Sequence, residues 1–268
     1  MVNGPQRQNT KSASLFIGCA GWSLPKTEQA RFKTTGSHLE RYASRFKAVE
    51  INSSFYRSHR PATYARWGDS VPTDFRFAVK IPKAITHVMR LENVDEQLMK
   101  SFLAEIAPLR DKLGCLLVQL PPSLGFVKEI ASRFVGVMRA HTNMVVACEP
   151  RHRSWFTDEA DSLLQELQVA RVAADPALVP AAAEPGGWRG ISYYRLHGSP
   201  KKYYSEYSDE FIAALRERLR KDLAVSREVW CIFDNTALGA ATRNALDLRE
   251  TDDASETTRS TKQLRNSL

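Results

Sequence analysis

Residues 144–152, MVVACEPRH, form a short apolar run that ends in charged side chains. An apolar run without alternating polarity is typical of a parallel strand that is buried on both faces. Seven more runs of this kind occur along the chain, over residues 15–19, 48–51, 76–81, 115–120, 170–174, 192–196 and 229–233. The sequence therefore predicts eight parallel strands, of which residues 144–148 form the fifth.

Helical patterns lie between several of these runs. Ser37 and Glu40 have the S-x-x-E spacing of a capping box. The stretch that they open carries Leu39, Tyr42 and Phe46 on one helical face. Similar spacings predict helices near residues 98–109, 130–137, 163–167, 211–219 and 240–248, whereas the second and sixth connections look short or irregular. Strands that alternate with helices predict right-handed β-α-β units and a parallel sheet.

The chain length fits one domain of a particular architecture. The chain has 268 residues, and a β/α barrel typically needs about 250. We predict the α/β class, with a single TIM-type (β/α)8 barrel of eight parallel strands over residues 14–248 and some short or irregular helices. An open doubly wound sheet is the alternative, but the first run is not followed by its G-x-G-x-x-G turn. Residues 1–13 and 249–268 lack hydrophobic periodicity and are predicted to be disordered tails.

Charge and cysteine usage limit the partners and the compartment. The net charge of +8 permits a small anionic substrate or a nucleic acid as partner without requiring either. The chain begins with polar residues, and no segment approaches the ~20 apolar residues of a membrane span. The cysteines lack C-x-x-C spacing and lie in apolar runs, so we expect no disulfide framework and a cytoplasmic location. They are Cys19, Cys115, Cys148 and Cys231.

Polar residues stand where the predicted strands end. In a β/α barrel the carboxyl ends of the strands and the loops beyond them carry the chemistry. Residues two apart on a strand share a face, so Arg195 and His197 point the same way. The candidate catalytic residues are Glu50, Glu149, His197 and Asp234. The candidate substrate-binding residues are Trp22, Asn52, Tyr56, Lys80, His87, Gln119, Arg151, Arg195 and Asn235.

These charged strand ends have two interpretations. Buried charges are unfavourable unless they are paired or solvated, so a ring of them around one opening predicts a site. The alternative is a structural layer of salt bridges in which the residues only neutralise one another. In a site, the planar forks of Arg151 and Arg195 suit an anion such as phosphate. His197 or a nearby carboxylate then acts as general acid or base.

Two further alternatives stay open from the residues alone. A divalent metal is one, magnesium or manganese on oxygen ligands or zinc with a histidine. Its ligands would come from Glu50, Glu149, Asp175, His197 and Asp234. A non-catalytic module is the other, because basic residues interleaved with aromatics, as in Lys201-Lys202-Tyr203-Tyr204, are typical of single-stranded nucleic-acid binding.

Seven ordered motifs resemble the YecE-like family, also called domain of unknown function 72. They are GCAGWS (18–23), LERYASRFKAVEINSSFYR (39–57), DFRFAVKIPKAITH (74–87), LLVQLPPS (116–123), CEPRHRSW (148–155), YYRLHG (193–198) and CIFDNTALGAATRNAL (231–246). The resemblance covers residues 14–248 and implies a TIM-type barrel that is similar in architecture to endonuclease IV and xylose isomerase. The family's role is not established. Residues 23–36, SLPKTEQARFKTTG, replace a longer aromatic segment of the family, so this chain departs from the pattern in its first β-α loop.

Our best functional interpretation is therefore an enzyme, a hydrolase or lyase, that acts on a phosphorylated, sugar or nucleic-acid substrate at the mouth of the barrel. The second interpretation is a non-catalytic module that binds nucleic acid or another anion. Metal dependence, the substrate and the oligomeric state are not predicted.

Overall fold

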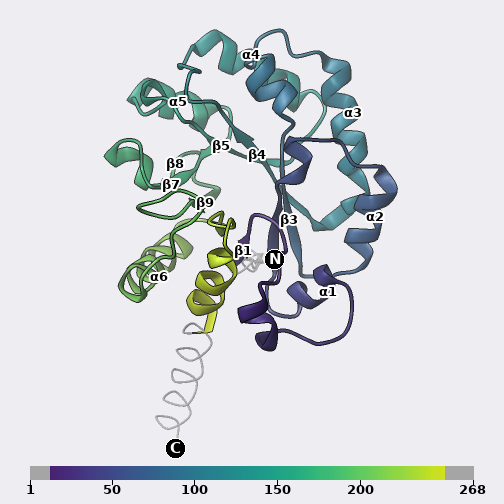
Figure 1. Cartoon of the computed structure of the whole chain (residues 1–268). Helices are drawn as coiled ribbons and strands as arrows, with labels where there is room; N and C mark the ends of the chain where they lie inside the picture. Colours follow the sequence, from purple (N-terminus) through teal and green to yellow (C-terminus); the bar gives the residue numbers. More distant parts are fainter. Residues whose placement is uncertain (1–12, 251–268) are drawn as a thin grey trace, which may run out of the picture.

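Short strands, most of them followed by a helical segment, run through residues 13–250, which this computed structural model describes (Figure 1). All eight predicted runs contain a strand, and the sixth contains two. The strands are β1 (Ser14–Cys19), β2 (Ala48–Ile51), β3 (Arg76–Lys80), β4 (Leu113–Gln119), β5 (Val145–Glu149), β6 (Val169–Arg171), β7 (Ala173–Asp175), β8 (Gly186–Gly187), β9 (Ile191–Leu196) and β10 (Glu228–Phe233).

The strands form two sheets rather than one. The first has the order β1-β10-β9-β7 and the second the order β2-β3-β4-β5-β6-β8, and every pairing is parallel except that of β6 with β8. The predicted α/β class with parallel strands is confirmed. Hydrogen bonds among the described residues do not close a single eight-stranded barrel, because β1 and β2 share one bridge, between Ala20 and Glu50. At the other seam β6 pairs with β5 while β7 pairs with β9, although only Val172 separates β6 from β7.

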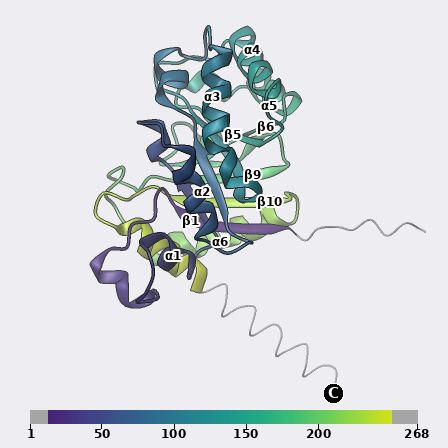
Figure 2. The ribbon, with the colours of Figure 1, turned by 90° about the vertical axis from the view of Figure 1, so that its right-hand side faces the viewer.

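The helices follow the capping signals of the sequence. The capping box of Ser37 and Glu40 is present at the start of α1, and Thr157 and Ser208 cap α5 and α6 through their side chains. The longer helices are α1 (His38–Ala43), α2 (Pro61–Asp69), α3 (Glu96–Ile106), α4 (Lys128–Arg139), α5 (Asp158–Glu166) and α6 (Asp209–Leu223). Figures 1 and 2 show α3 and α4 side by side on the outside of the strands. None of the helices within residues 13–250 is long and apolar enough to cross a membrane.

The two irregular connections have different outcomes. The second holds an ordinary helix, α2, which begins with a proline at its first position, where the missing N–H costs nothing. The sixth is irregular as predicted, with a short 3-10 turn, Pro180–Ala183, and the antiparallel strand β8. The last helix spans residues 240–250 and exceeds its predicted end. The predicted C-terminal tail was therefore wrong for Arg249 and Glu250, and Glu250 pairs with Arg31 and Arg45. The remainder of both predicted tails, apart from Ala13, lies outside the described residues.

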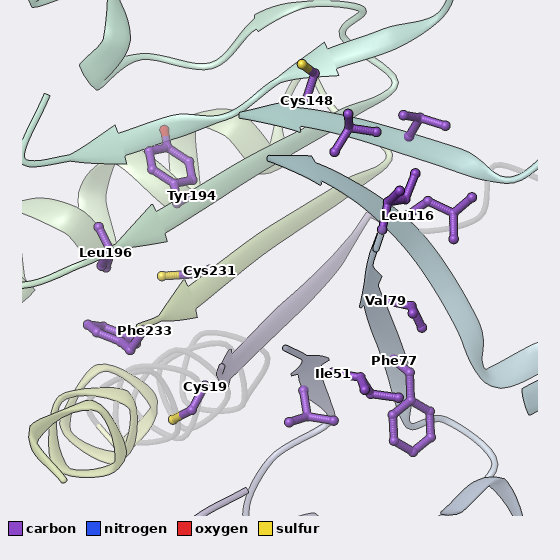
Figure 3. Close-up of a cluster of buried hydrophobic side chains, with 14 of the residues drawn as sticks. Cys19, Ile51, Phe77, Val79, Leu116, Cys148, Tyr194, Leu196, Cys231 and Phe233 are labelled. Carbon is purple, nitrogen blue, oxygen red and sulfur yellow. The ribbon is translucent and has the colours of Figure 1, made fainter. Parts of the chain in front are cut away.

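An outer apolar core lies between the sheets and the helices (Figure 3). Three of the four cysteines, Cys19, Cys148 and Cys231, belong to it, and all four are free and buried. Burial raises the pKa of each thiol, that of Cys19 to about 12, against the weaker opposing effect of its hydrogen bond with Tyr42. These thiols therefore act as small apolar side chains, as their sequence context predicts.

An inner apolar core lies on the opposite face of the strands, and both sheets contribute to it. Trp230 is its largest member, stacked on Tyr193 with ring centroids 5.9 Å apart and tilted against Phe16 at 4.7 Å. A Cβ atom on Gly114 would lie 2.7 Å from the Trp230 ring, so only glycine leaves room for it. The inner core lies beneath the charged side chains at the ends of the strands.

Candidate active site at the strand ends

The alternation of each strand carries a polar residue from the inner core toward the strand's end. Two residues after an inner-core residue, the same face presents a polar side chain. The pairs are Ala48 and Glu50, Ala78 and Lys80, Leu117 and Gln119, Ala147 and Glu149, Tyr193 and Arg195, and Ile232 and Asp234. Both sheets thus place polar side chains above one shared apolar core. We name the second residues of these pairs the polar layer, or the layer for short.

Arg195 is the centre of the polar layer and has no exposed surface. Its Nε and Nη2 donate to the two oxygens of Glu50, at 2.9 and 2.6 Å, in a bidentate pair. Its Nη1 donates to Glu149 at 2.8 Å, and Nη2 also lies 3.1 Å from Asp234. One guanidinium therefore joins carboxylates from β2 and β5 and from the end of β10, across both sheets.

His197 is held between two of the same carboxylates. Its Nδ1 lies 3.0 Å from Asp234 Oδ2, and its Nε2 lies 2.8 Å from Glu149 Oε1. The side chain is almost completely buried, and its ring and that of Tyr203 are nearly perpendicular, with centroids 5.8 Å apart. We name Glu50, Glu149, Arg195, His197 and Asp234 the ion cluster.

Arg151 extends the ion cluster toward solvent. Its Nη2 lies 2.6 Å from Glu149 Oε1 and 3.0 Å from His197 Nε2, and 15% of its side chain is exposed. Its Nε is fully buried and has no hydrogen-bond partner. The guanidinium of Arg151 therefore pairs with Glu149 through Nη2, while its Nε remains a donor without an acceptor.

The charges of the ion cluster stabilise one another's ionised forms. Burial acts to raise the pKa of Glu149, but Arg151 and Arg195 outweigh it and hold that pKa well below its ordinary value. The pKa of Asp234 is also lowered, because Arg195 and the hydrogen bond from His197 outweigh burial. For Arg195, Glu50 and the other two carboxylates outweigh burial and raise its pKa. Glu149 and Asp234 therefore stay ionised near neutral pH, so they are poor proton donors there.

Lys80 is a second cation of the polar layer, and it forms no ion pair with the ion cluster. It is only 4% exposed, and no hydrogen bond or ion pair joins its Nζ to any described residue. The ammonium lies 4.0 Å from the centroid of the Phe55 ring. Burial, together with the charge of Arg195, lowers the pKa of Lys80 to about 8 despite the opposing charges of Glu50, Asp234 and Glu149.

His87 lies on the same side of the layer as Lys80. Burial and the charges of Lys80, Lys83 and Arg151 lower its pKa, so its ring is neutral at neutral pH. Its Nδ1 is 2.9 Å from Thr86 Oγ1, and its ring meets Phe55 edge-on at 4.9 Å. Lys80 and Arg151 both act electrostatically on the neutral His87 ring, and we name these three residues the basic side of the layer. All three are among the candidate substrate-binding residues of the sequence.

A separate pocket of about 400 Å³ opens beside the first two strands and is lined by Trp22, Asn52 and Ser53, among others. Asn52 Oδ1 is fully buried without a partner, while the Trp22 ring packs edge-on against Trp67. Ser53 Oγ lies 2.8 Å from His59 Nε2. Trp22 and Asn52 therefore lie together in this pocket, and among the described residues no side-chain hydrogen bond or ion pair joins them to the ion cluster.

The remaining predicted residues take other positions. Tyr56 is 72% exposed and packs on Phe55, and Gln119 is half-buried at the end of β4. Asn235 is fully buried and donates to Ser205 O and to Asn244 Oδ1, so it ties down a loop. Of the thirteen candidates, the structure joins Glu50, Glu149, His197, Asp234, Arg151 and Arg195 by direct contacts.

Sequence reasoning missed Tyr193 as a member of the site. Its hydroxyl donates to Glu50 Oε2 at 3.1 Å, and the side chain is fully buried. Tyr193 has the same strand parity as Arg195, which is the one signal that the sequence offered. The contact of Phe55 with Lys80 could not be predicted either, because it requires the folded chain.

The ion cluster is a poor fit for a metal ion. Within residues 13–250, no group of three or more histidine, cysteine, aspartate or glutamate side chains is arranged to hold one. Arg195 occupies the position between the three carboxylates, where it supplies the positive charge that a cation would bring. The proposed ligand Asp175 instead accepts from the Tyr207 hydroxyl at 2.8 Å.

Residues 16–266 match the family described as "Protein of unknown function DUF72". This chain belongs to that family. UPF0759 protein YecE of Escherichia coli (strain K12) is 33% identical over 175 residues, which are 63% of this chain and 61% of that protein. The match thus spans about three-fifths of the length of YecE. UPF0759 protein YunF of Bacillus subtilis (strain 168) is 22% identical over 88% of this chain and 94% of its own length.

Solved structures of the DUF72 family agree with the fold. A DUF72 protein of Enterococcus faecalis V583, EF0366, is 25% identical with a TM-score of 0.75, over 90% of this chain and 98% of that one. TM1631 of Thermotoga maritima MSB8 is 24% identical with a TM-score of 0.74, over 90% and 99%. Because the family is described as one of unknown function, the function has to be inferred from the site.

Proposed function

We propose that this chain is an enzyme that binds a small anionic substrate above the inner core and uses Lys80 to transfer a proton. The observation that carries the proposal is the unpaired ammonium of Lys80, which stands beside a set of carboxylates that are all paired. A charged group that is buried without a partner is costly, so a bound anion is the natural partner for it.

The basic side of the layer supports a phosphorylated or sugar-phosphate substrate. Arg151 has a buried Nε that lacks a partner, and Lys80 adds a second cation within the same layer. A planar guanidinium suits a phosphate, whose oxygens it binds in pairs. A group with a pKa of about 8 exchanges protons near neutral pH, which suits hydrolysis or elimination with a proton-assisted leaving group.

We also propose that the two sheets together form a single eight-stranded barrel of TIM type. The inner core draws side chains from both sheets, and the bridge between Ala20 and Glu50 joins β1 to β2. In that arrangement the ion cluster and Lys80 stand at the carboxyl ends of the strands, where β/α barrels carry their active sites. Free, buried thiols also favour a reducing compartment, and we propose the cytoplasm.

The test is calorimetric titration of inorganic phosphate and glycerol phosphate into the purified protein at low salt and pH 7. Lys80→Met and Arg151→Met are expected to weaken phosphate binding at least tenfold, because each removes a cation that faces the anion. Lys128→Met and Arg133→Met remove the same charges from exposed positions and serve as matched controls. Equal effects in the test and control variants, or no phosphate binding at millimolar concentration, would refute the site.

Turnover separates the enzyme from a binding module. Lys80→Arg retains a positive charge but cannot release its proton near neutral pH. A panel of phosphate monoesters and sugar phosphates is incubated with both proteins and followed by phosphorus NMR. We expect Lys80→Arg to bind phosphate and to lose turnover of whichever compound the wild type consumes.

The second candidate, a non-catalytic nucleic-acid module, rests on the loop after β9. Lys201 Nζ lies 4.2 Å from the centroid of the Tyr204 ring, and Tyr203 and Tyr204 are each 43% exposed. Such aromatic and basic groups hold single-stranded nucleic acid by stacking and charge. Salt-dependent binding of a single-stranded oligonucleotide that Lys201→Ala weakens, without turnover in the panel, would favour this candidate.

A further inference from the structure

Lys80 has the surroundings of an amine nucleophile. Beyond a cation that binds or transfers protons, we propose that its Nζ forms an imine with the carbonyl group of a small anionic substrate. The inference rests on the proposed function, because it assigns the substrate's anionic group to the same basic side of the layer. It adds a substrate class, carbonyl compounds that carry a phosphate or carboxylate, and a covalent step.

The first argument is that nothing sequesters the amine. Arg195 forms ion pairs with Glu50, Glu149 and Asp234, and none of these carboxylates forms an ion pair with Lys80. Nζ has no hydrogen bond within the described residues, yet it is not completely buried. A small part of the ammonium surface is therefore accessible, although Lys80 as a whole is only 4% exposed.

The second argument is rigidity. Lys80 ends β3, and the Ser54 hydroxyl donates to its carbonyl oxygen at 2.7 Å. The ring of Phe55, in the next residue along, lies beneath the ammonium at 4.0 Å. A nucleophile that is held on a strand and packed on one side can attack from one direction only, which suits covalent catalysis better than loose charge binding.

The third argument is electrostatic. A lysine becomes nucleophilic when desolvation and a nearby cation favour its neutral form. Lys80 is buried, and Arg195 is the cation that acts on it most strongly. Glu50, Asp234 and Glu149 act on it in the opposite sense and would stabilise the positive imine once it forms. The lowered pKa of Lys80 agrees with this geometry.

The step balances without an added reagent. The neutral Nζ adds to the carbonyl carbon while one of its own protons passes to the carbonyl oxygen, which gives a neutral carbinolamine. A proton from the solvent then lets the hydroxyl group leave as water, and a protonated imine remains, in which one C=N bond replaces one C=O bond. Hydrolysis by water reverses the sequence and frees Lys80.

The test uses pyridoxal 5′-phosphate, an aldehyde that carries a phosphate, followed by sodium borohydride. Hydride reduces the imine to a stable secondary amine, and peptide mass spectrometry locates it. We expect Lys80 to be labelled at least tenfold faster than the exposed Lys128, with a rate that rises through pH 8. Excess inorganic phosphate should protect Lys80 and leave Lys128 unprotected.

The outcomes separate this inference from the proposed function. Phosphate binding in the calorimeter with no reduced adduct on Lys80 would overturn the imine and leave the anion site intact. Labelling spread evenly over exposed lysines would overturn it as well. Absence of both phosphate binding and a Lys80 adduct would refute both proposals. Lys80→Arg should lose the adduct, and circular dichroism checks that this variant is folded.

Discussion

Arg195 and Lys80 are two buried cations on the same inner face, yet their surroundings are opposite. Arg195 contacts three carboxylates, whereas Lys80 has no hydrogen bond or ion pair within the described residues. Their pKa values move apart as a result, upward for Arg195 and down to about 8 for Lys80. The same layer therefore holds a guanidinium that stays charged and an amine that can gain or lose a proton near pH 8.

This difference suggests a division of labour within the layer. A buried charge whose partners are all present holds those partners in place, because each lost contact would leave an uncompensated charge. A buried charge without partners costs stability and is retained more readily where it has a function. We therefore propose that the ion cluster stabilises the fold and that Lys80 takes part in the reaction.

The largest effect is expected from Arg195→Met. The substitution leaves Glu50, Glu149 and Asp234 buried without their common partner, which costs about 3–5 kcal/mol of the free energy of unfolding. Urea denaturation followed by circular dichroism measures it. Lys80→Met is the matched control, since it removes a buried cation that has no ion pair. Equal destabilisation by the two variants would abolish the contrast between the two cations.

The second prediction concerns pH and Lys80. Its pKa falls from an ordinary 10.5 to about 8 in the folded chain, which corresponds to about 3 kcal/mol of stability lost while the amine is charged. Between pH 8 and 10.5 the unfolded chain keeps this proton and the folded chain releases it, so this group makes stability rise with pH. At pH 7, Lys80→Met should therefore be more stable than the wild type by up to about 3 kcal/mol.

The pH dependence of that difference is the decisive measurement. The advantage of Lys80→Met should shrink as the pH is raised from 8 toward 10.5, because the wild-type penalty disappears. Lys128→Met, at an exposed position, should differ from the wild type by a constant amount over the same range. A gap for Lys80→Met that does not change with pH would show that Lys80 carries no such penalty.

Much of this layer could be predicted from local sequence. Apolar runs located the strands, and alternation placed Arg195 and His197 on the same face of their strand. Capping residues such as Ser37 and Ser208 located helix starts, because their hydroxyls satisfy N–H groups that the helix leaves free. These signals act over a few residues and need no knowledge of the fold.

Pairing between distant residues could not be predicted in the same way. Arg195 and Lys80 are 145 and 30 residues away from Glu50 in the sequence, and local patterns do not show which of them pairs with it. The sequence therefore listed both cations alike, as candidate substrate-binding residues. The division of the sixth run between two sheets was also missed. Its residues read as one apolar run, and only their neighbours, β5 on one side and β9 on the other, separate β6 from β7.

The smallest effect is expected from Tyr193→Phe, which removes one hydrogen bond from the edge of the ion cluster. The hydroxyl donates to Glu50 Oε2 at 3.1 Å, but Arg195 Nε donates to the same oxygen at 2.9 Å and stays in place. The loss should be about 2 kcal/mol, the range for a hydrogen bond to a charged group, and urea denaturation measures it.

Tyr194→Phe is the matched control for that change. Its hydroxyl also donates to a carboxylate, Asp222 at 2.8 Å, but on the outer face of the same strand and next to half-buried Asp222. Because water can replace the lost donor there, we expect about 1 kcal/mol or less. If Tyr193→Phe costs no more than Tyr194→Phe, then the interior of the ion cluster is as well solvated as the surface. In that case the large cost expected for Arg195→Met would lose its physical basis, because solvated carboxylates do not need a buried partner.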